Sequence, residues 1–248
     1  MTRWWNHNKH LLPRLDVLLL FISALAFILW PQIDIWLTGL FYQQGFYLAQ
    51  LPEIEFIYRL FAKIHFLWLL VLIGLIVVCQ VFLVRNSKRR DTWLSVRRSA
   101  NYLLVSILLI PGILVNTVIK NNTIGRARPN DTTLFGGDLN FTAPFTYSGA
   151  CETNCSFVSG HAAIAFFIIA LAWALQDRRW YFIGLAIGSA VGLTRIMQGG
   201  HFLSDVIFAF WFVHFGCLWL AGWFRLSPIS SSAKKPLLQP SALSQPRS

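Results

Sequence analysis

Six long apolar runs dominate the pattern of hydrophobic and polar positions along the chain. They lie at residues 17–36, 56–84, 100–119, 157–175, 181–197 and 202–223. Each approaches the ~20 residues that a helix needs to cross the hydrocarbon core of a bilayer. One soluble core cannot hide this much apolar side chain in a 248-residue protein that is 56% hydrophobic. The pattern therefore predicts an all-α fold, a polytopic membrane bundle with about six transmembrane helices.

The net charge of +11 is spread between the apolar runs and does not form one patch. Fifteen of the 21 Lys and Arg residues lie before the first run, between the second and third, between the fourth and fifth, or after the sixth. The positive-inside rule assigns these four segments to the cytoplasm. Both termini are therefore predicted to be cytoplasmic, and nucleic acid is not expected as a partner.

This layout divides the chain into three parts. We expect a cytoplasmic segment at 1–14, a six-helix membrane domain at 15–226, and a disordered cytoplasmic tail at 227–248, which is rich in Ser, Pro, Lys and Gln. The basic start and the sequence Ala24-Leu25-Ala26 also resemble a cleavable signal peptide. We expect the run to be retained, because it continues to Trp30 and its removal would put the two termini on opposite sides of the membrane.

The segment 31–55 lacks Lys and Arg but contains Asp34, Glu53 and Glu55. By the same charge rule it lies on the outer side of the membrane. We expect an outward-facing loop or an interfacial helix there.

The four cysteines fall into two pairs by location. Cys79 and Cys217 lie inside apolar runs, where a thiol packs as a small apolar group. Cys151 and Cys155 precede the fourth run, on the outer side, where an oxidising periplasm would allow a disulfide, although their spacing alone does not establish the geometry. No further Cys or His lies close by to complete four zinc ligands.

Basic residues on the outer side of the membrane need an explanation, since the positive-inside rule makes them scarce there. Lys120 and Gly125-Arg126-Ala127-Arg128-Pro129 follow the third run. Two arginine forks and a lysine point charge suit a cluster of phosphate oxygens, so binding an anion is the simplest explanation. A basic rim that contacts lipid headgroups is the alternative.

A second polar cluster, Ser156-Phe157-Val158-Ser159-Gly160-His161, marks the start of the fourth run. Backbone N–H groups at a helix start favour anions. Gly160 allows close approach, the Ser159 hydroxyl can donate a hydrogen bond, and His161 can exchange a proton near neutral pH. Taken alone, such a tripeptide is more often a helix-capping serine followed by an incidental histidine.

The third cluster lies across the turn between the fifth and sixth runs and contains Thr194-Arg195, His201 and Asp205. The last two are four residues apart and share a helix face, so the carboxylate can accept from one imidazole nitrogen while the other is directed at substrate. They could also be two metal ligands or an ordinary hydrogen-bonded pair. Arg195 just upstream favours an anion over a cation, and we expect no metal.

Together the clusters resemble the type 2 phosphatidic acid phosphatase superfamily, whose signature is Lys-x6-Arg-Pro, Pro-Ser-Gly-His and Ser-Arg-x5-His-x3-Asp. The corresponding motifs lie at 120–129, 156–161 and 194–205. Thr194 stands in place of the serine of the third motif, and Val158 stands in place of the proline of the second. Seven residues, not six, separate Lys120 from Arg128.

The extra residue affects the expected position of Lys120. A bulge at Asn121-Asn122 could absorb it. Alternatively, Arg126 could take over part of the work of the lysine as a phosphate-binding residue.

The resemblance implies catalysis through a phosphohistidine without metal or cofactor. His201 attacks phosphorus, and Asp205 holds its ring and stabilises the imidazolium. His161 protonates the leaving oxygen and then activates water. The residues expected to bind the equatorial phosphate oxygens are Lys120, Arg128, Arg195, Ser159 and the N–H of Gly160.

An outward-facing site near the bilayer surface suits a phosphate on a lipid headgroup. Residues 31–35, 151–157 and 198–202 resemble bacterial lipid A phosphatases, which implies lipid A as substrate at the periplasmic face of the inner membrane. The loops at 31–55 and 130–150 would then recognise its sugar and acyl groups.

Other functions remain as alternatives. Within the same chemistry, undecaprenyl diphosphate and phosphatidylglycerophosphate are rival substrates, and a phosphotransferase would pass the phosphoryl group to another lipid. Vanadium-dependent haloperoxidases share the anion site but resemble soluble enzymes. A transporter or scaffold would explain the apolar runs but not the spacing of the polar motifs.

Overall fold

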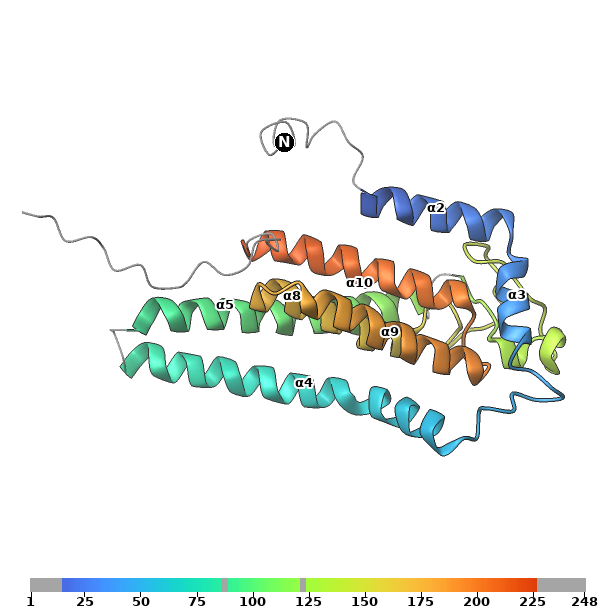
Figure 1. The fold of residues 1–248 in the computed structure, drawn as a ribbon, viewed down its shortest axis with the longest axis horizontal. Coiled ribbons are helices and arrows are strands. Elements are labelled where there is room, and N and C mark those ends of the chain that lie inside the picture. Colours follow the sequence, from blue (N-terminus) through green and yellow to red (C-terminus); the bar gives the residue numbers. More distant parts are fainter. Residues whose placement is uncertain (1–14, 86–88, 121–123, 227–248) are drawn as a thin grey trace, which may run out of the picture.

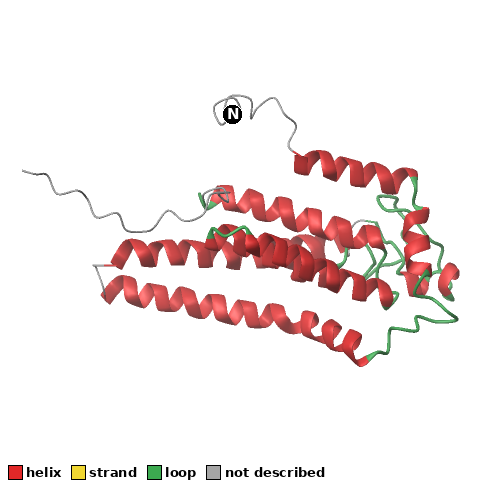
Figure 2. Ribbon diagram, viewed as in Figure 1, coloured by secondary structure: helices red, strands yellow, loops and turns green. Residues whose placement is uncertain are grey.

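The computed structural model describes residues 15–85, 89–120 and 124–226. The predicted N-terminal segment 1–14, the tail 227–248 and the bulge at Asn121-Asn122 lie outside these residues. The described residues form helices and loops and contain no β-strand (Figure 2). The prediction of an all-α protein is therefore confirmed.

Long helices lying alongside one another form the body of the molecule (Figure 1). Those long and apolar enough to cross a membrane are α4 (Pro52–Arg85), α5 (Arg90–Ile107) continued by the π-helix η2 (Leu108–Ile119), α9 (Arg179–Met197) and α10 (Leu203–Trp223). A shorter apolar helix consists of α7 (Gly160–Phe166), η5 (Phe167–Ile169) and α8 (Ala170–Leu175). The described residues thus contain four candidate membrane spans, or five when the bent N-terminal pair is counted as one.

The first apolar run does not form the single helix that its composition predicts. α2 (Leu15–Leu29) ends just before Pro31, and α3 (Gln32–Gly39) continues at an angle of 83°. Proline lacks a backbone N–H and disfavours helical geometry in the residue before it, so the helix breaks here. The break turns α3 across the end of the bundle (Figure 1). Asp34 is consequently fully buried and does not lie in an outward-facing loop.

The third apolar run begins later than the helix that contains it. α5 starts at Arg90, ten residues before the predicted 100–119 segment. Its first turns carry charged side chains and are less apolar, so hydropathy alone missed them. Further along, η2 contains Pro111, whose missing N–H interrupts the regular helical ladder and accompanies the wider π-helical geometry. Asn116 donates from its side chain to the carbonyl oxygen of Pro111 (2.6 Å).

The core surrounds the short helix that begins at Gly160. Its inner positions are filled by side chains with almost no exposed surface, namely Ala162, Ala163, Ala165, Phe166, Phe167, Ile169 and Ala172. α9 and α10 pack on this helix, and η2 lies beside its N-terminal half. The N-terminus of α7 is therefore held among several helices at one end of the bundle.

Two short 3₁₀ turns lie in the loop that follows Arg128. They are η3 (Pro129–Asp131) and η4 (Thr133–Phe135). They follow Arg128, so the loop that carries the first polar motif turns back over the end of the bundle near α3 (Figure 1).

Candidate active site

The second and third polar motifs are joined by hydrogen bonds although they are more than 40 residues apart. The Ser156 hydroxyl donates to Asp205 Oδ2 (2.5 Å), and the backbone N–H of Ser159 donates to the carbonyl oxygen of Asp205 (3.1 Å). His201 Nδ1 lies 2.7 Å from the carbonyl oxygen of Ser156. The start of α7 and the start of α10 therefore form one polar centre.

The tautomer of His201 follows from its contact with Ser156. A carbonyl oxygen can only accept, so Nδ1 carries the proton and Nε2 keeps its lone pair. Nε2 is buried and has no hydrogen-bond partner among the described residues. Asp205 Oδ2 lies 3.6 Å from the same Nδ1, so the two predicted partners are in contact, but the Ser156 carbonyl oxygen is the nearer acceptor. His201 thus presents an unprotonated nitrogen, as a nucleophile requires.

Burial also keeps His201 neutral. Burial holds the pKa of the His201 imidazole well below its usual range. The charges of Lys120 and Arg195 also lower this pKa, whereas Asp205 raises it. An imidazole with a depressed pKa is unprotonated at neutral pH. Its Nε2 lone pair is therefore available without prior loss of a proton.

Asp205 is held as a carboxylate by donors alone. Its Oδ1 accepts from Arg126 Nη1 (2.7 Å), and its Oδ2 accepts from the Ser156 hydroxyl (2.5 Å) and the N–H of Phe202 (2.8 Å). Phe202 is the N-cap residue of α10, where a carboxylate in the first turn is also favoured by the helix dipole. The carboxylate is fully buried and fixed in one orientation.

Three cations, Lys120, Arg128 and Arg195, lie near His201, and none of them forms a salt bridge with a carboxylate of the described residues. Burial, together with the charges of Arg128 and Arg195, lowers the pKa of Lys120 to about 8. No carboxylate among residues 15–85, 89–120 and 124–226 forms a salt bridge with any of the three. Like charges held close together are unfavourable unless an anion joins them. The arrangement favours binding of a multiply charged anion.

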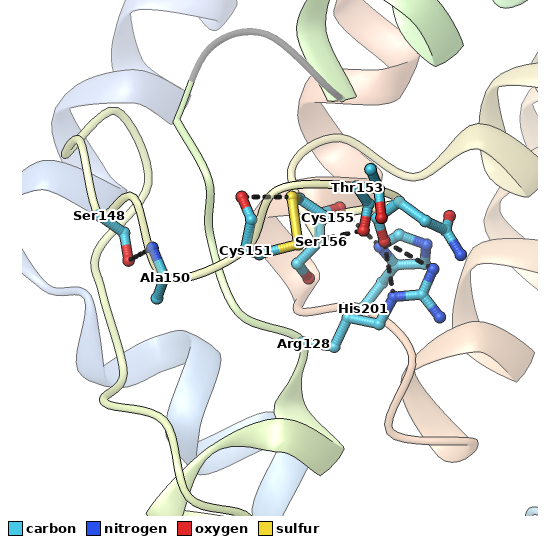
Figure 3. The surroundings of a disulfide bond; sticks show 9 residues. Arg128, Ser148, Ala150, Cys151, Thr153, Cys155, Ser156 and His201 are labelled. Carbon is cyan, nitrogen blue, oxygen red and sulfur yellow. Dashed lines mark hydrogen bonds between the residues drawn. A yellow bond between two sulfur atoms is a disulfide. The ribbon is translucent and has the colours of Figure 1, made fainter.

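One backbone carbonyl oxygen joins Arg128 to the loop between Cys151 and Cys155. Arg128 donates from Nε and Nη2 to the carbonyl oxygen of Asn154 (3.0 and 2.8 Å). Asn154 lies between Cys151 and Cys155, whose Sγ atoms are bonded in a disulfide (Figure 3). In Figure 3 the guanidinium of Arg128 and the ring of His201 lie on the same side of this loop. The short loop closed by the disulfide therefore supports Arg128 at the polar centre.

Tyr58 of α4 contacts two of the predicted site residues, and sequence reasoning missed it. The Arg195 guanidinium carbon lies 4.6 Å from the centre of the Tyr58 ring, and the His161 ring stacks on the same ring at 4.7 Å. Arg195 Nη1 also donates to Gln198 Oε1. Tyr58 lies in an apolar run without a motif, so no local sequence signal marks it.

The Ser-Gly-His tripeptide caps α7 and lies against η2. Ser159 is the N-cap residue, and its hydroxyl oxygen accepts from the N–H of Ala162 (3.4 Å). A Cβ on Gly160 would lie 2.2 Å from Asn116 Oδ1, so a larger residue would require the Asn116 side chain to move. His161 Nε2 is buried and has no hydrogen-bond partner among the described residues. The capping interpretation of Ser159 holds, and its hydroxyl hydrogen can still be donated.

Arg126 does not join the other cations. Its side chain is fully buried and donates to Ser204 Oγ, Asp205 Oδ1, Asp34 Oδ2 and the Thr142 carbonyl oxygen, each at 2.7 to 2.8 Å. These acceptors leave it no surface for a substrate. The expectation that Arg126 takes over phosphate binding from Lys120 is wrong, because two carboxylates already bind its guanidinium.

A cavity of about 460 Å³ opens beside the polar centre. Its polar wall includes Lys120, Gly160 and His161, and its apolar wall is built by α4, the end of α5, η2 and α7. The apolar residues on that wall include Leu69, Ile107, Leu108, Pro111 and Ile164. The space suits a ligand with a charged group attached to an apolar chain. Within the described ranges, no three His, Cys, Asp or Glu side chains lie together as metal ligands.

Comparison with known proteins agrees with this chemistry. The PAP2 superfamily matches residues 99–229. A lipid A 4'-phosphatase of Francisella tularensis subsp. novicida is 30% identical over 210 residues, which cover 81% of this chain and 90% of that protein. A lipid A 4'-phosphatase of Rhizobium leguminosarum is 38% identical over 107 residues, or 42% of this chain and 46% of that protein.

A lipid A 1-phosphatase of Rhizobium etli is 34% identical over 145 residues, which cover 58% of this chain and 55% of that protein. No solved structure gives a significant match. The superfamily match contains all three polar motifs.

Proposed function

Because the chain belongs to the PAP2 superfamily and is a membrane lipid phosphatase, we propose that it hydrolyses a phosphate monoester of lipid A through a phosphohistidine at His201. The observation that carries this proposal is the group of Lys120, Arg128 and Arg195 around an unprotonated Nε2 of His201. Within the described part of the chain, the three cations form no salt bridge and Nε2 has no hydrogen-bond partner. Such a group can bind the phosphate dianion and present it to the nucleophile. A bound phosphate also offsets the mutual repulsion of the cations.

In the proposed reaction, the Nε2 lone pair of His201 forms a bond to phosphorus while the bond from phosphorus to the lipid oxygen breaks. His161 gives its proton to that oxygen. His161 then takes a proton from water, whose oxygen attacks phosphorus, breaks the N–P bond and releases inorganic phosphate. Asp205 stabilises the positive ring of the intermediate.

The phosphate oxygens are bound by fixed donors in this proposal. Lys120, Arg128 and Arg195 supply the positive charge, and Ser159 with the N–H of Gly160 supplies neutral donors. All five act on charge that is spread over the equatorial oxygens in the transition state. The protein's own cations neutralise that charge, so the proposed steps use no metal or cofactor.

Lipid A as substrate is supported by the printed activities of the relatives and by the cavity. A relative that covers 81% of this chain is a lipid A 4'-phosphatase, which favours the 4'-phosphate. The cavity that begins at Lys120 and His161 continues along apolar side chains of α4 and η2, as the acyl part of a lipid requires.

The proposed topology has six spans, with both termini in the cytoplasm and the site at the periplasmic face of the inner membrane. The count becomes six when the bent pair α2 and α3 and the short helix from Gly160 to Leu175 are each taken as one span. The described basic residues support this orientation, because those at the C-terminal end of α4 and the N-terminal end of α5 lie at the end of the bundle opposite α3 (Figure 1). Residues 15–226 would form the membrane domain.

The experiment that tests the proposal is mass spectrometry of lipid A from Gram-negative cells that express the wild type or His201→Ala. We expect lipid A lighter by one phosphate only with the wild type, and fragmentation should locate the loss at the 4' position. Loss at the 1 position would correct the regiochemistry. Unchanged lipid A, with phosphate released by purified protein from undecaprenyl diphosphate or phosphatidylglycerophosphate, would overturn the substrate, and equal loss with His201→Ala would overturn the nucleophile.

A further inference from the structure

We propose that Asp34 and Arg126 are positioning residues that keep one net negative charge beside His201 during the phosphohistidine step. With Asp205 they form a buried row of charges, carboxylate, guanidinium and carboxylate, which we call the buried triad. The inference rests on the proposed role of His201 as nucleophile. It assigns a catalytic purpose to α3, which carries none of the superfamily motifs.

The triad is connected by short, direct contacts. Arg126 Nη2 donates to Asp34 Oδ2 (2.8 Å), and Arg126 Nη1 donates to Asp205 Oδ1 (2.7 Å). Arg126 therefore bridges a residue on α3 and a residue on α10 that are far apart in the chain. It links α3 directly to the carboxylate that lies beside His201.

Asp34 is bound as a carboxylate, because its contacts are all donors. Besides Arg126, its Oδ1 accepts from the N–H of Ser204 (2.8 Å), and its Oδ2 accepts from the Ser204 hydroxyl (2.5 Å). Among these contacts only the Ser204 hydroxyl oxygen could accept a proton from a neutral acid, and it already accepts from Arg126 Nη1 (2.8 Å). These donors favour the negative charge on Asp34, whereas its burial and the nearby Asp205 oppose it.

The triad is sealed from water. All three side chains are fully buried. The Arg126 guanidinium carbon lies 4.3 Å from the ring centre of Phe202 and 5.4 Å from that of Phe141. Charges in such surroundings are weakly screened, so each acts strongly on its neighbours.

The charges of the triad explain why a second carboxylate is needed. If Arg126 faced Asp205 alone, the pair would be neutral and would offer little to a positive imidazole ring. Asp34 adds a charge and brings the total to −1. When His201 Nε2 bonds to phosphorus while Nδ1 keeps its proton, the ring becomes positive and is stabilised by that net charge.

The Ser156 carbonyl cannot supply this charge. It fixes the direction of the His201 ring through Nδ1, but it is a neutral acceptor. Orientation and charge are therefore provided by different groups. Ser156 fixes the orientation of the His201 ring, and the buried triad determines the electrostatic potential around it. A substitution that changes only the charge should accordingly affect turnover more than substrate binding.

The first variant is Asp34→Asn, which keeps the shape and removes the charge. Phosphate release from lipid A by purified protein in detergent should show kcat lower by about 100-fold, the size typical for loss of one preorganised electrostatic partner. KM should stay within about threefold, because the phosphate-binding cations are unchanged. A matched control on the same helix is Thr38→Val, since the buried Thr38 hydroxyl has no hydrogen-bond partner among the described residues. It should retain the wild-type kcat.

The double variant Asp34→Asn/Arg126→Gln separates charge from structure. It replaces Asp34 and Arg126 by neutral groups of similar shape. The net charge of the buried triad is then again −1, carried by Asp205 alone. We expect its kcat, per folded protein, to exceed that of Asp34→Asn and to lie within about tenfold of the wild type. If Asp34→Asn yields no folded protein, Asp34→Ser, which removes the same charge, takes its place in this comparison.

Two results would overturn the inference: a wild-type kcat in Asp34→Asn, or a double variant less active than Asp34→Asn, as a purely structural role predicts. His201→Ala measured in parallel distinguishes this failure from failure of the proposed function. Activity lost in His201→Ala but kept in Asp34→Asn overturns only the role of the triad. Activity kept in His201→Ala overturns the proposed nucleophile, and with it the triad.

Discussion

Arg126 and Arg128 are two residues apart in one motif, yet the fold gives them opposite surroundings. Arg126 is fully buried between two carboxylates and two aromatic rings. Arg128 is partly exposed, donates to one neutral carbonyl and lies with other cations near the cavity. A guanidinium already bound by carboxylates stabilises the protein around it, whereas one that faces a neutral acceptor can still bind an anion. The partners therefore decide what each arginine does.

The largest effect that tests this comparison is on folding. Arg126→Met would leave Asp34 and Asp205 buried without their shared cation, which should destabilise the protein by about 3–5 kcal/mol. Thermal unfolding in detergent, followed by tryptophan fluorescence, should show a clear loss of Tm. The matched variant Arg128→Met removes the same group from a partly exposed position and should melt close to the wild type. Equal melting of the two variants would contradict the comparison.

The reverse pattern is expected for catalysis. Arg128→Ala should reduce kcat/KM for phosphate release by about 100-fold, because it removes one fixed cation from the transition state, while Tm stays close to the wild-type value. Arg128→Lys keeps the charge but loses the fork, and it should recover part of the activity. Unchanged kcat/KM in Arg128→Ala would place Arg128 outside the phosphate site.

A smaller effect concerns pH and extends the comparison to Lys120, whose pKa is lowered to about 8 by burial and by Arg128 and Arg195. The lysine is charged below pH 8 and loses its proton as pH rises through that value. Since kcat/KM reports groups of the free enzyme, it should fall above pH 8 and approach a tenfold loss per pH unit. Lys120→Arg should remove this alkaline limb, and a wild-type profile that stays flat to pH 10 would argue against the role of Lys120.

The sequence predicts the long helices well and the bend poorly. The runs at 181–197 and 202–223 match α9 and α10 within two residues, because apolar composition alone defines a membrane-crossing helix. Pro31 could be read in the sequence, but it lay inside an uninterrupted apolar run. The helix break at this position was therefore not predicted. The ion partner of Asp34 lies 92 residues away, and no local pattern identifies a partner at that distance.

The sequence predicted those parts of the site that depend on the spacing of side chains. It did not predict those that depend on backbone acceptors or on burial. The spacing of His201 and Asp205 correctly placed the two side by side. The acceptor for His201 is the Ser156 carbonyl oxygen, and every residue has a carbonyl, so the sequence contains no sign of it. Arg126 and Arg128 both fit a basic motif, and only their packing distinguishes them.

The four cysteines have one practical consequence. Two are bonded to each other, and the other two, Cys79 and Cys217, have no exposed surface. The chain contains no further cysteine. Any cysteine introduced at an exposed position would therefore be the one thiol ready to react with a water-soluble maleimide. Single-site labelling can map the sidedness of each loop in the native background, without first removing the natural cysteines and the disulfide that supports Arg128.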